Sequence, residues 1–289
     1  MQYQDNAVMT IDQAVPAQAD SDAQLVEIWL HGRARRTVRA YRAGAQAFMD
    51  HAGKPLPAIT VGDVQAFAGS LDHLAPASQA AQLSAVKSLL AYAHRLGYLP
   101  FDVGKPVKLP PIKSTLAERI ISEADVHQLL AHERRPRNKM LLLLIYAAGL
   151  RVSEACGLAW RDVVGRQDGG QITIFGKGGK TRTILLPASV YDQLEAMRSG
   201  DDDPVFRSLQ GGHLDPAQVH RIVKAAARRA DLPAAISTHW LRHAHASHSL
   251  DRGAAIHLVQ ATLGHASVAT TGRYLHARPN DSSARYLAV

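Results

Sequence analysis

The sequence predicts a mainly α-helical protein with one small β-sheet, built as a helical N-terminal domain followed by an α+β C-terminal domain. Apolar residues recur at helical spacing over residues 21–98 and again after residue 119. Two short segments, residues 171–175 and 181–186, have the composition of β-strands. A length of 289 residues with a proline-rich break between the two helical regions favours two domains.

The composition is that of a globular protein without membrane segments. Hydrophobic residues make up 46% of the chain, and the longest apolar run, residues 140–150, is shorter than the about 20 residues that cross a bilayer. The first 30 residues contain no Lys or Arg and no apolar block, which predicts that there is no signal peptide. The single cysteine, Cys156, excludes an intramolecular disulfide and indicates a reducing compartment. We expect a soluble, cytoplasmic protein.

Positive charge is concentrated after the first 32 residues. The net charge is +8 and the isoelectric point is near 9.7. Residues 1–32 contain five acidic residues and no Lys or Arg, so the rest of the chain carries 33 basic against 20 acidic residues. This distribution predicts a polyanionic partner, although a basic surface that only maintains solubility would have the same composition.

The first domain is expected to be a bundle of four helices over residues 21–104, preceded by a flexible tail over residues 1–20. Residues with capping side chains are expected to begin the helices, and these are Ser21 or Asp22, Thr37, Thr60 and Ser78. Asp63, three residues after Thr60, gives an acidic variant of the capping box. Gly53 and Gly97 are expected to end the second and fourth helices.

Residues 105–118 are rich in proline and are expected to form an extended basic linker. Its lysines are candidate contacts to a phosphate backbone, and they are Lys105, Lys108 and Lys113. The segment would separate the two domains whether or not these lysines bind a partner.

Residues 119–289 are expected to form the second domain, in which a buried helix over residues 137–148 ends at Gly149. The residues expected to begin other helices are Ser122, Asp215 with Pro216, and Thr238. The helix after Pro216 is expected to run to about Ala230. The glycine-rich residues 176–180 are expected to join the two strands as a hairpin.

Arg151 stands at the start of a helical segment between apolar neighbours. A guanidinium in that position needs an anionic partner, and its planar fork suits a phosphate. Glu154, three residues later, could instead hold Arg151 in a structural ion pair. The segment alone leaves both interpretations open.

His239 and Arg242 lie three residues apart in one expected helix and therefore share a face. His239 falls in the first turn, where the helix dipole disfavours protonation and leaves a neutral imidazole that can accept a proton. A metal site on His239 and His243 is the rival interpretation. However, the glutamate that a zinc protease places between its histidines is missing, and the chain has no cysteine cluster.

His265 follows a turn glycine, Gly264, and Tyr274 comes nine residues later. Taken alone, His265 would be an ordinary capping residue and Tyr274 an ordinary packed side chain. Taken together, the chain offers two arginines, two histidines and a tyrosine. These are the groups that an enzyme needs to attack a phosphodiester with a phenolic oxygen.

The order Arg151, His239-x-x-Arg242, Leu-Gly-His265 and Tyr274 resembles that of the tyrosine recombinase (phage integrase) family. The resemblance extends over nearly the whole chain. It implies a SAM-like core-binding helical domain followed by a tyrosine recombinase catalytic domain.

The resemblance implies a role for each residue. Tyr274 would be the nucleophile that forms a 3′-phosphotyrosine and frees a 5′-hydroxyl. The groups that would neutralise the pentavalent phosphorane are Arg151, Arg242 and His265. His239 would assist as proton acceptor, and Glu154 would support the arginines.

The resemblance also assigns different roles to the basic residues near the hairpin turn. Lysines in a glycine-rich turn are usually solvated, but a lysine whose pKa is lowered by neighbouring cations can protonate a leaving alkoxide. Lys177 stands in a Gly-Lys-Gly setting like that of the family's catalytic lysine, so it is favoured as the acid over Lys180. Lys180 and Arg182 are expected to contact DNA.

The implied partners are double-stranded DNA with two inverted half-sites and three further copies of the chain, with or without a paralogous recombinase. The implied reaction passes through a Holliday junction, and the segment after the tyrosine docks on a neighbouring protomer. Because the phosphoester bond is exchanged and not lost, we expect no ATP, metal or other cofactor. His245 and Leu275 depart from the family pattern, which puts only local packing in doubt.

The acidic tail is too small for an arm-binding domain, which favours a simple Xer-like recombinase of the nucleoid. Its role would be integration and excision or dimer resolution. Two other functions fit part of the pattern. A type IB topoisomerase uses similar chemistry but does not exchange strands between two sites. A DNA-binding protein that keeps the fold without catalysis would form no covalent adduct.

Overall fold

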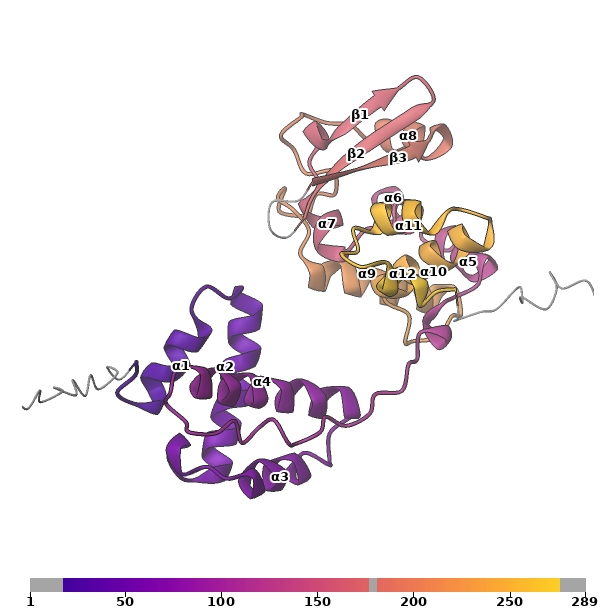
Figure 1. The fold of residues 1–289 in the computed structure, drawn as a ribbon. Coiled ribbons are helices and arrows are strands. Elements are labelled where there is room, and N and C mark those ends of the chain that lie inside the picture. The colour runs from indigo at the N-terminus through magenta and orange to yellow at the C-terminus, as the bar shows by residue number, and fades with distance from the viewer. Residues whose placement is uncertain (1–17, 177–180, 276–289) are drawn as a thin grey trace, which may run out of the picture. The chain divides into compact units, whose positions relative to one another are not determined.

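The computed structural model describes residues 18–176 and 181–275, and the chain divides into two compact units, residues 1–113 and 114–289 (Figure 1). Each unit has its own hydrophobic core. Helices dominate both units, and the second unit also contains one small antiparallel sheet. No helix within the described ranges is long and apolar enough to cross a membrane.

The first unit is a bundle of four helices, α1 (Asp22–Leu30), α2 (Arg35–Ala52), α3 (Val61–Ser70) and α4 (Pro76–Arg95). Its core includes Trp29, Phe48 and Phe67, all almost fully buried. The predicted caps at Ser21 and Thr60 are present, and Thr60 forms the predicted capping box with Asp63.

Two predicted helix starts in the first unit are wrong. The second helix begins at Arg35 and not at Thr37, and the fourth begins at Pro76 and not at Ser78. Neither helix has a side-chain cap. Pro76 occupies the first turn, where its fixed φ angle suits a helix and its missing N–H is not needed.

The predicted linker, residues 105–118, contributes to both units. Val107 is buried in the first core, and Nζ of Lys87 donates to the carbonyl oxygen of Gly104 at 2.6 Å and to that of Val107. Leu116, in contrast, packs against a buried cluster of the second unit.

The helices of the second unit are α5 (Glu123–Ala131), α6 (Pro136–Ala147), α7 (Val152–Gly157), α8 (Ala188–Glu195), α9 (Pro216–Arg229), α10 (Thr238–Asp251), α11 (Ile256–Leu263) and α12 (Val268–Gly272). Ser122 and Asp215 cap α5 and α9 as predicted. The prediction that Thr238 caps α10 is wrong, because Thr238 is the first helical residue and Ser237 occupies the cap position.

The sheet has three strands in the order β1 (Val163–Arg166), β2 (Gly169–Phe175) and β3 (Thr181–Pro187). The sequence predicted the β2–β3 hairpin and missed β1, whose four residues bury only Val163 and therefore lack a strand pattern. Helix α8 packs on β2, and a Cβ atom at Gly170 would lie 2.0 Å from the ring of Tyr191. In Figure 1, α8 lies beside the sheet.

Candidate active site

Three arginines from different parts of the second unit converge on the C-terminal end of α11. Each carbonyl oxygen of residues 262–264 accepts a hydrogen bond from a different arginine. In the order of the carbonyls, the donors are Arg182 Nε at 2.7 Å, Arg242 Nη2 at 2.6 Å and Arg151 Nη2 at 3.3 Å. The last carbonyls of a helix lack partners within the helix and form the negative end of its dipole, so they attract cations. Positive charge is thereby gathered beside the next residue, His265.

Glu154 is the buried anion that holds two of these arginines. Its side chain is 6% exposed, and Oε1 accepts a hydrogen bond from Nη1 of Arg151 at 2.8 Å while Oε2 accepts one from the Arg151 backbone N–H at 2.8 Å. Burial acts to raise the pKa of Glu154, but hydrogen bonds from Arg182 and Arg151 outweigh it and lower the pKa to about 2. Arg151 therefore makes the ion pair of the structural interpretation, while 39% of its side chain stays exposed and open to a phosphate.

Arg182 has a structural role that the sequence did not indicate. Its side chain is 13% exposed, and Nη1 and Nη2 donate to Oε1 and Oε2 of Glu154 at 2.9 and 2.8 Å. With Nε bonded to Thr262, each of its guanidinium nitrogens already has a partner within the protein. The expected contact of Arg182 with DNA stays a prediction, whereas its support of Glu154 and α11 is explicit in the geometry.

Arg242 is buried and joins the end of α6 to the end of α11. Besides the bond to Leu263, its Nη1 donates to the carbonyl oxygen of Gly149. Gly149 has a φ of +59°, and a Cβ atom there would lie 2.7 Å from His245, so glycine is required at this position. Burial, followed by the charge of Arg151, lowers the pKa of Arg242 to about 10, which leaves it cationic at neutral pH.

The two predicted histidines lie near these arginines, and the pKa of each is lowered. Nδ1 of His265 lies 2.9 Å from Oγ1 of Thr271, and burial together with the charges of Arg242 and Arg151 lowers the pKa of His265 to about 4. His239 lies in the first turn of α10 with an exposed side chain. Desolvation by neighbouring atoms, and then the charge of Arg242, lowers the pKa of His239 as well.

Tyr274 is buried directly after α12, and its hydroxyl is bonded to a histidine that was not among the predicted site residues. Its oxygen lies 2.8 Å from Nδ1 of His243, and its ring packs in the cluster that contains Val259 and Leu263. Burial raises the pKa of Tyr274, and the charge of Arg242 acts in the opposite direction. His243 is one turn after His239 and adjacent to Arg242, but nothing in the sequence links it to a tyrosine 31 residues away.

A hollow of about 630 Å³ lies beside this set. It is lined by Arg151, Glu154, Arg182, Gly264 and His265 among others. Gly176 and Thr181, which flank the hairpin turn, also line it. Lys177 and Lys180 belong to that turn and lie outside the described residues.

The remaining predicted contacts, Lys105, Lys108 and Lys113, are exposed residues of the first unit. Their binding to DNA stays a prediction.

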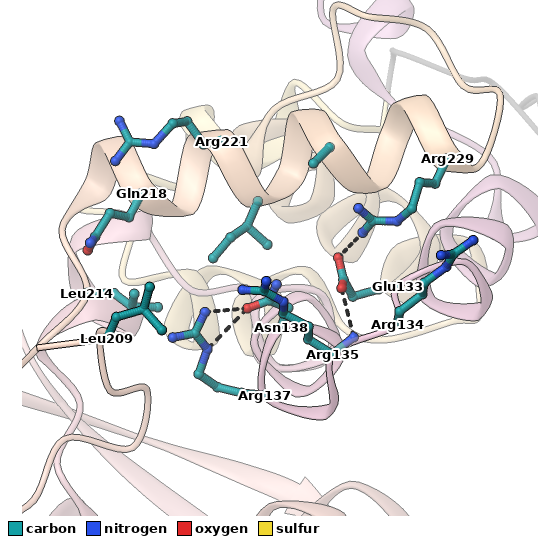
Figure 2. Close-up of a pocket in the computed structure, with 12 residues that line it drawn as sticks. Glu133, Arg134, Arg135, Arg137, Asn138, Leu209, Leu214, Gln218, Arg221 and Arg229 are labelled. Carbon is teal, nitrogen blue, oxygen red and sulfur yellow. Dashed lines mark hydrogen bonds and ion pairs between the residues drawn. The ribbon is translucent and has the colours of Figure 1, made fainter. Parts of the chain in front are cut away.

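A second hollow of the same unit as the arginine site, of about 510 Å³, is rich in arginine (Figure 2). It is lined by the chain that leads into α6 and by one side of α9. Arg229 is paired there with Glu133, and Arg137 donates to Oδ1 of Asn138 at 2.6 and 3.1 Å. The other arginines that line it are Arg134, Arg135 and Arg221. None of the predicted catalytic residues lines this hollow.

Comparison with known proteins identifies the family. The phage integrase family matches residues 119–281, and the SAM-like N-terminal domain of phage integrases matches residues 27–97. Tyrosine recombinase XerD of Pseudomonas aeruginosa is 35% identical over 294 residues, which cover 92% of this chain and 96% of that protein. Tyrosine recombinase XerC of Corynebacterium efficiens is 31% identical over 262 residues, covering 85% and 82%.

Solved structures share the fold at low sequence identity. XerH bound to its difH substrate in a pre-cleavage complex has a TM-score of 0.72 and 22% identity, over 93% of this chain and 84% of that one. A lambda integrase tetramer bound to a Holliday junction has a TM-score of 0.73 and 17% identity, over 91% and 80%. Since the family match spans more than half of the sequence and the XerD relative aligns with most of it, the chain belongs to the phage integrase family and is a site-specific tyrosine recombinase.

Proposed function

We propose that this recombinase cleaves DNA by attack of the Tyr274 hydroxyl on a phosphodiester, forming a 3′-phosphotyrosine and releasing a 5′-hydroxyl. The observation that carries the proposal is the convergence of Arg151, Arg242 and His265 at the end of α11. The charge of Arg242 acts on both His265 and Tyr274. A phosphate bound to these arginines would therefore be close to the proposed nucleophile.

Arg242 and Arg151 would stabilise the phosphate in different ways. Arg242 is fixed by two backbone carbonyls, so its charge is preorganised and needs no rearrangement when the transition state forms. Arg151 is held on one side by Glu154 and is partly exposed on the other. Fixed guanidinium and imidazole groups can stabilise the phosphorane without a metal ion, and exchange of one phosphoester for another needs no ATP.

Lys177 would act as the acid that protonates the leaving 5′-oxygen. The support is indirect, because the residue lies outside the described part of the chain. Its neighbour Gly176 lines the hollow beside Arg151 and His265. Cations that surround an ammonium lower its pKa and make it a better proton donor.

The proposed substrate is double-stranded DNA with two inverted half-sites, and the proposed working unit is a tetramer on two such sites. The lambda integrase tetramer on a Holliday junction, which shares the fold, supports this assembly. The net charge of +8 supports a polyanionic partner. A protein acting on chromosomal or plasmid DNA would be found with the nucleoid.

Replacement of Tyr274 by Phe tests the proposal. The Tyr274→Phe variant should fold and bind DNA normally but form no covalent adduct with a nicked suicide substrate. If adducts persist, the nucleophile is another tyrosine, and Tyr286, which lies outside the described residues, is the nearest in sequence. Wild-type protein that relaxes supercoiled DNA without exchanging strands between two sites would instead be a topoisomerase.

A further inference from the structure

Among the residues that the structure describes, His243 is the side chain that hydrogen-bonds the hydroxyl of Tyr274. The phenolic oxygen and Nδ1 of the imidazole are 2.8 Å apart, which is within the range of a strong hydrogen bond. The two rings have centroids 5.8 Å apart and planes inclined at 47°, so they meet through this bond and do not stack. We propose that His243 takes the phenolic proton when Tyr274 attacks the phosphate. This inference rests on the proposed role of Tyr274 as nucleophile.

The surroundings of His243 keep its ring neutral in the free protein. Burial comes first, followed by the positive or titratable groups around it: His239 and Arg242 on α10, Arg119 before α5, and Arg273 after α12. Together they lower the pKa of His243 to about 4. A neutral imidazole with its proton on Nε2 presents a lone pair at Nδ1, which can accept the phenolic hydrogen.

The same cations define when the proton can move. Transfer in the free protein would place a new positive charge among Arg119, Arg242 and Arg273, so it is disfavoured. A DNA phosphate bound beside Arg242 adds negative charge and opposes that effect. Proton transfer is therefore coupled to substrate binding, and the buried hydroxyl stays protonated until DNA is present.

His239, the residue expected from the sequence to accept this proton, contacts the ring of His243. Its ring stacks on that of His243 with centroids 6.2 Å apart and an angle of 29° between the planes. His239 is exposed, whereas Tyr274 is buried. The pair of histidines thus leads from the buried hydroxyl to the surface, and His239 is positioned to relay a proton onward after His243 has received it.

Cleavage and religation each combine one phosphoester exchange with two proton transfers. The O–H bond of Tyr274 breaks and an N–H bond forms at Nδ1 of His243, while the phenolic oxygen forms a bond to phosphorus. The bond between phosphorus and the 5′-oxygen breaks, and that oxygen takes a proton from the general acid. In religation the 5′-hydroxyl attacks phosphorus and returns its proton to the deprotonated general acid, the bond between phosphorus and the phenolic oxygen breaks, and His243 returns its proton to the departing phenolate.

The alternative is that His243 only provides a hydrogen-bond partner for the Tyr274 hydroxyl, because a buried polar group needs such a partner. Asparagine separates the two roles, because its side-chain amide can occupy the position of Nδ1 and hydrogen-bond the hydroxyl but cannot take up a proton at neutral pH. His243→Asn is therefore the informative variant. His245→Asn is the matched control, since His245 is another imidazole on α10 with a lowered pKa, and its Nδ1 faces the carbonyl oxygen of Tyr146 at 2.8 Å.

The experiment measures single-turnover cleavage of a suicide substrate by the full-length protein from pH 5 to pH 9. For His243→Asn we expect cleavage at least about 100-fold slower at pH 7, with normal DNA binding and a rate that rises with pH as hydroxide replaces the missing base. The wild-type rate should level off where His243 is neutral, whereas the His243→Asn rate should keep rising to pH 9, and His245→Asn should keep the wild-type plateau.

Cleavage by His243→Asn within threefold of wild type across this range would overturn the proposal and leave a positioning role. If that variant melts far below the wild type, His243→Gln provides the same test, and a wild-type rate that rises with pH to pH 9 without a plateau also rejects His243 as the base. The adduct assay on Tyr274→Phe is separate, so a wrong nucleophile and a wrong base give different results.

Discussion

Glu154 and Arg182 form a two-point ion pair between α7 and β3, with nitrogen to oxygen distances of 2.9 and 2.8 Å. The pair joins the small sheet to the helix that follows Arg151, although the two residues are 28 positions apart in the sequence. Because Glu154 also bonds Arg151, the orientation of the proposed phosphate ligand depends on a residue of the sheet. The sheet is thus part of the support of the site.

Glu154→Gln should destabilise the second unit and reduce cleavage. The substitution leaves Arg151 and Arg182 without their anion while they remain crowded at the end of α11. The depressed pKa of Glu154, about 2, corresponds to about 3 kcal/mol of stability at neutral pH. A domain of this size loses about 2–4 °C of Tm per kcal/mol, so thermal melting should reveal the change. Glu123→Gln is the matched control, because Glu123 also makes a two-point pair with an arginine, Arg252, but on the surface where solvent screens it. An equal loss of Tm in both variants would contradict the structural role of Glu154.

The pH dependence of stability should carry the same signature. The folded-state pKa of Glu154 lies below its unfolded value, so its contribution is complete above about pH 5 and is lost as the pH falls towards 2. Between pH 7 and pH 3 the Tm should therefore fall more steeply with decreasing pH for the wild type than for Glu154→Gln. Parallel curves would show that this carboxylate does not couple folding to protons.

Much of the architecture could be predicted because it follows from local chemistry. The capping box at Thr60, the helix cap at Ser122 and the β2–β3 hairpin depend on neighbouring residues, and the structure contains all three. The starts of α2 and α4 were missed, because those helices begin without a capping side chain. Strand β1 was missed because one buried residue in four gives no period.

The candidate site was predictable in its residue types and not in its contacts. The order and spacing of the motifs, which resemble those of the tyrosine recombinase family, pointed to Arg151, His239, Arg242, His265 and Tyr274. The carbonyls of residues 262–264 carry no sequence signal, since every residue has one, and only the fold shows that three arginines meet there. The bond from His243 to Tyr274 spans 31 residues and was likewise invisible in the sequence.

Lys177→Ala should slow cleavage of an ordinary substrate and spare a substrate with a sulfur at the 5′-bridging position. Thiolate is a good leaving group and departs without a proton, so it does not need the acid. Single-turnover cleavage of both substrates measures the difference, with Lys180→Ala as the matched control in the same turn. Equal defects of Lys177→Ala on both substrates would reject the acid role and leave a simple phosphate contact.

DNA affinity should fall steeply with salt, because arginines and lysines that neutralise phosphates release counterions. The two units should bind DNA weakly when separated and tightly when joined.

We expect the triple variant Arg134→Ala, Arg135→Ala and Arg221→Ala at the hollow of Figure 2 to weaken binding of all sequences and to reduce the salt slope by roughly one for each phosphate that is no longer neutralised. A control with the same change in charge is Arg161→Ala, Arg166→Ala and Arg252→Ala. Equal effects of both triple variants would show that total charge, and not this hollow, sets the affinity.

The last prediction concerns the segment after the nucleophile, which lies outside the described residues from position 276 onward. It contains the apolar residues Tyr286, Leu287 and Val289. If this segment docks on a neighbouring protomer, as the resemblance to the family implies, it couples the position of each tyrosine to the next protomer and lets half of the sites act at a time. Deletion of residues 282–289 should then leave binding to a single site nearly intact but impair synapsis and strand exchange. Gel-shift assays on one site and on paired sites, run beside a recombination assay, measure the three steps separately. A segment that folds back on its own domain would give a different pattern, in which single-site binding or Tm falls together with recombination. Normal synaptic complexes and full recombination by the truncated protein would show that these eight residues are not the coupling element.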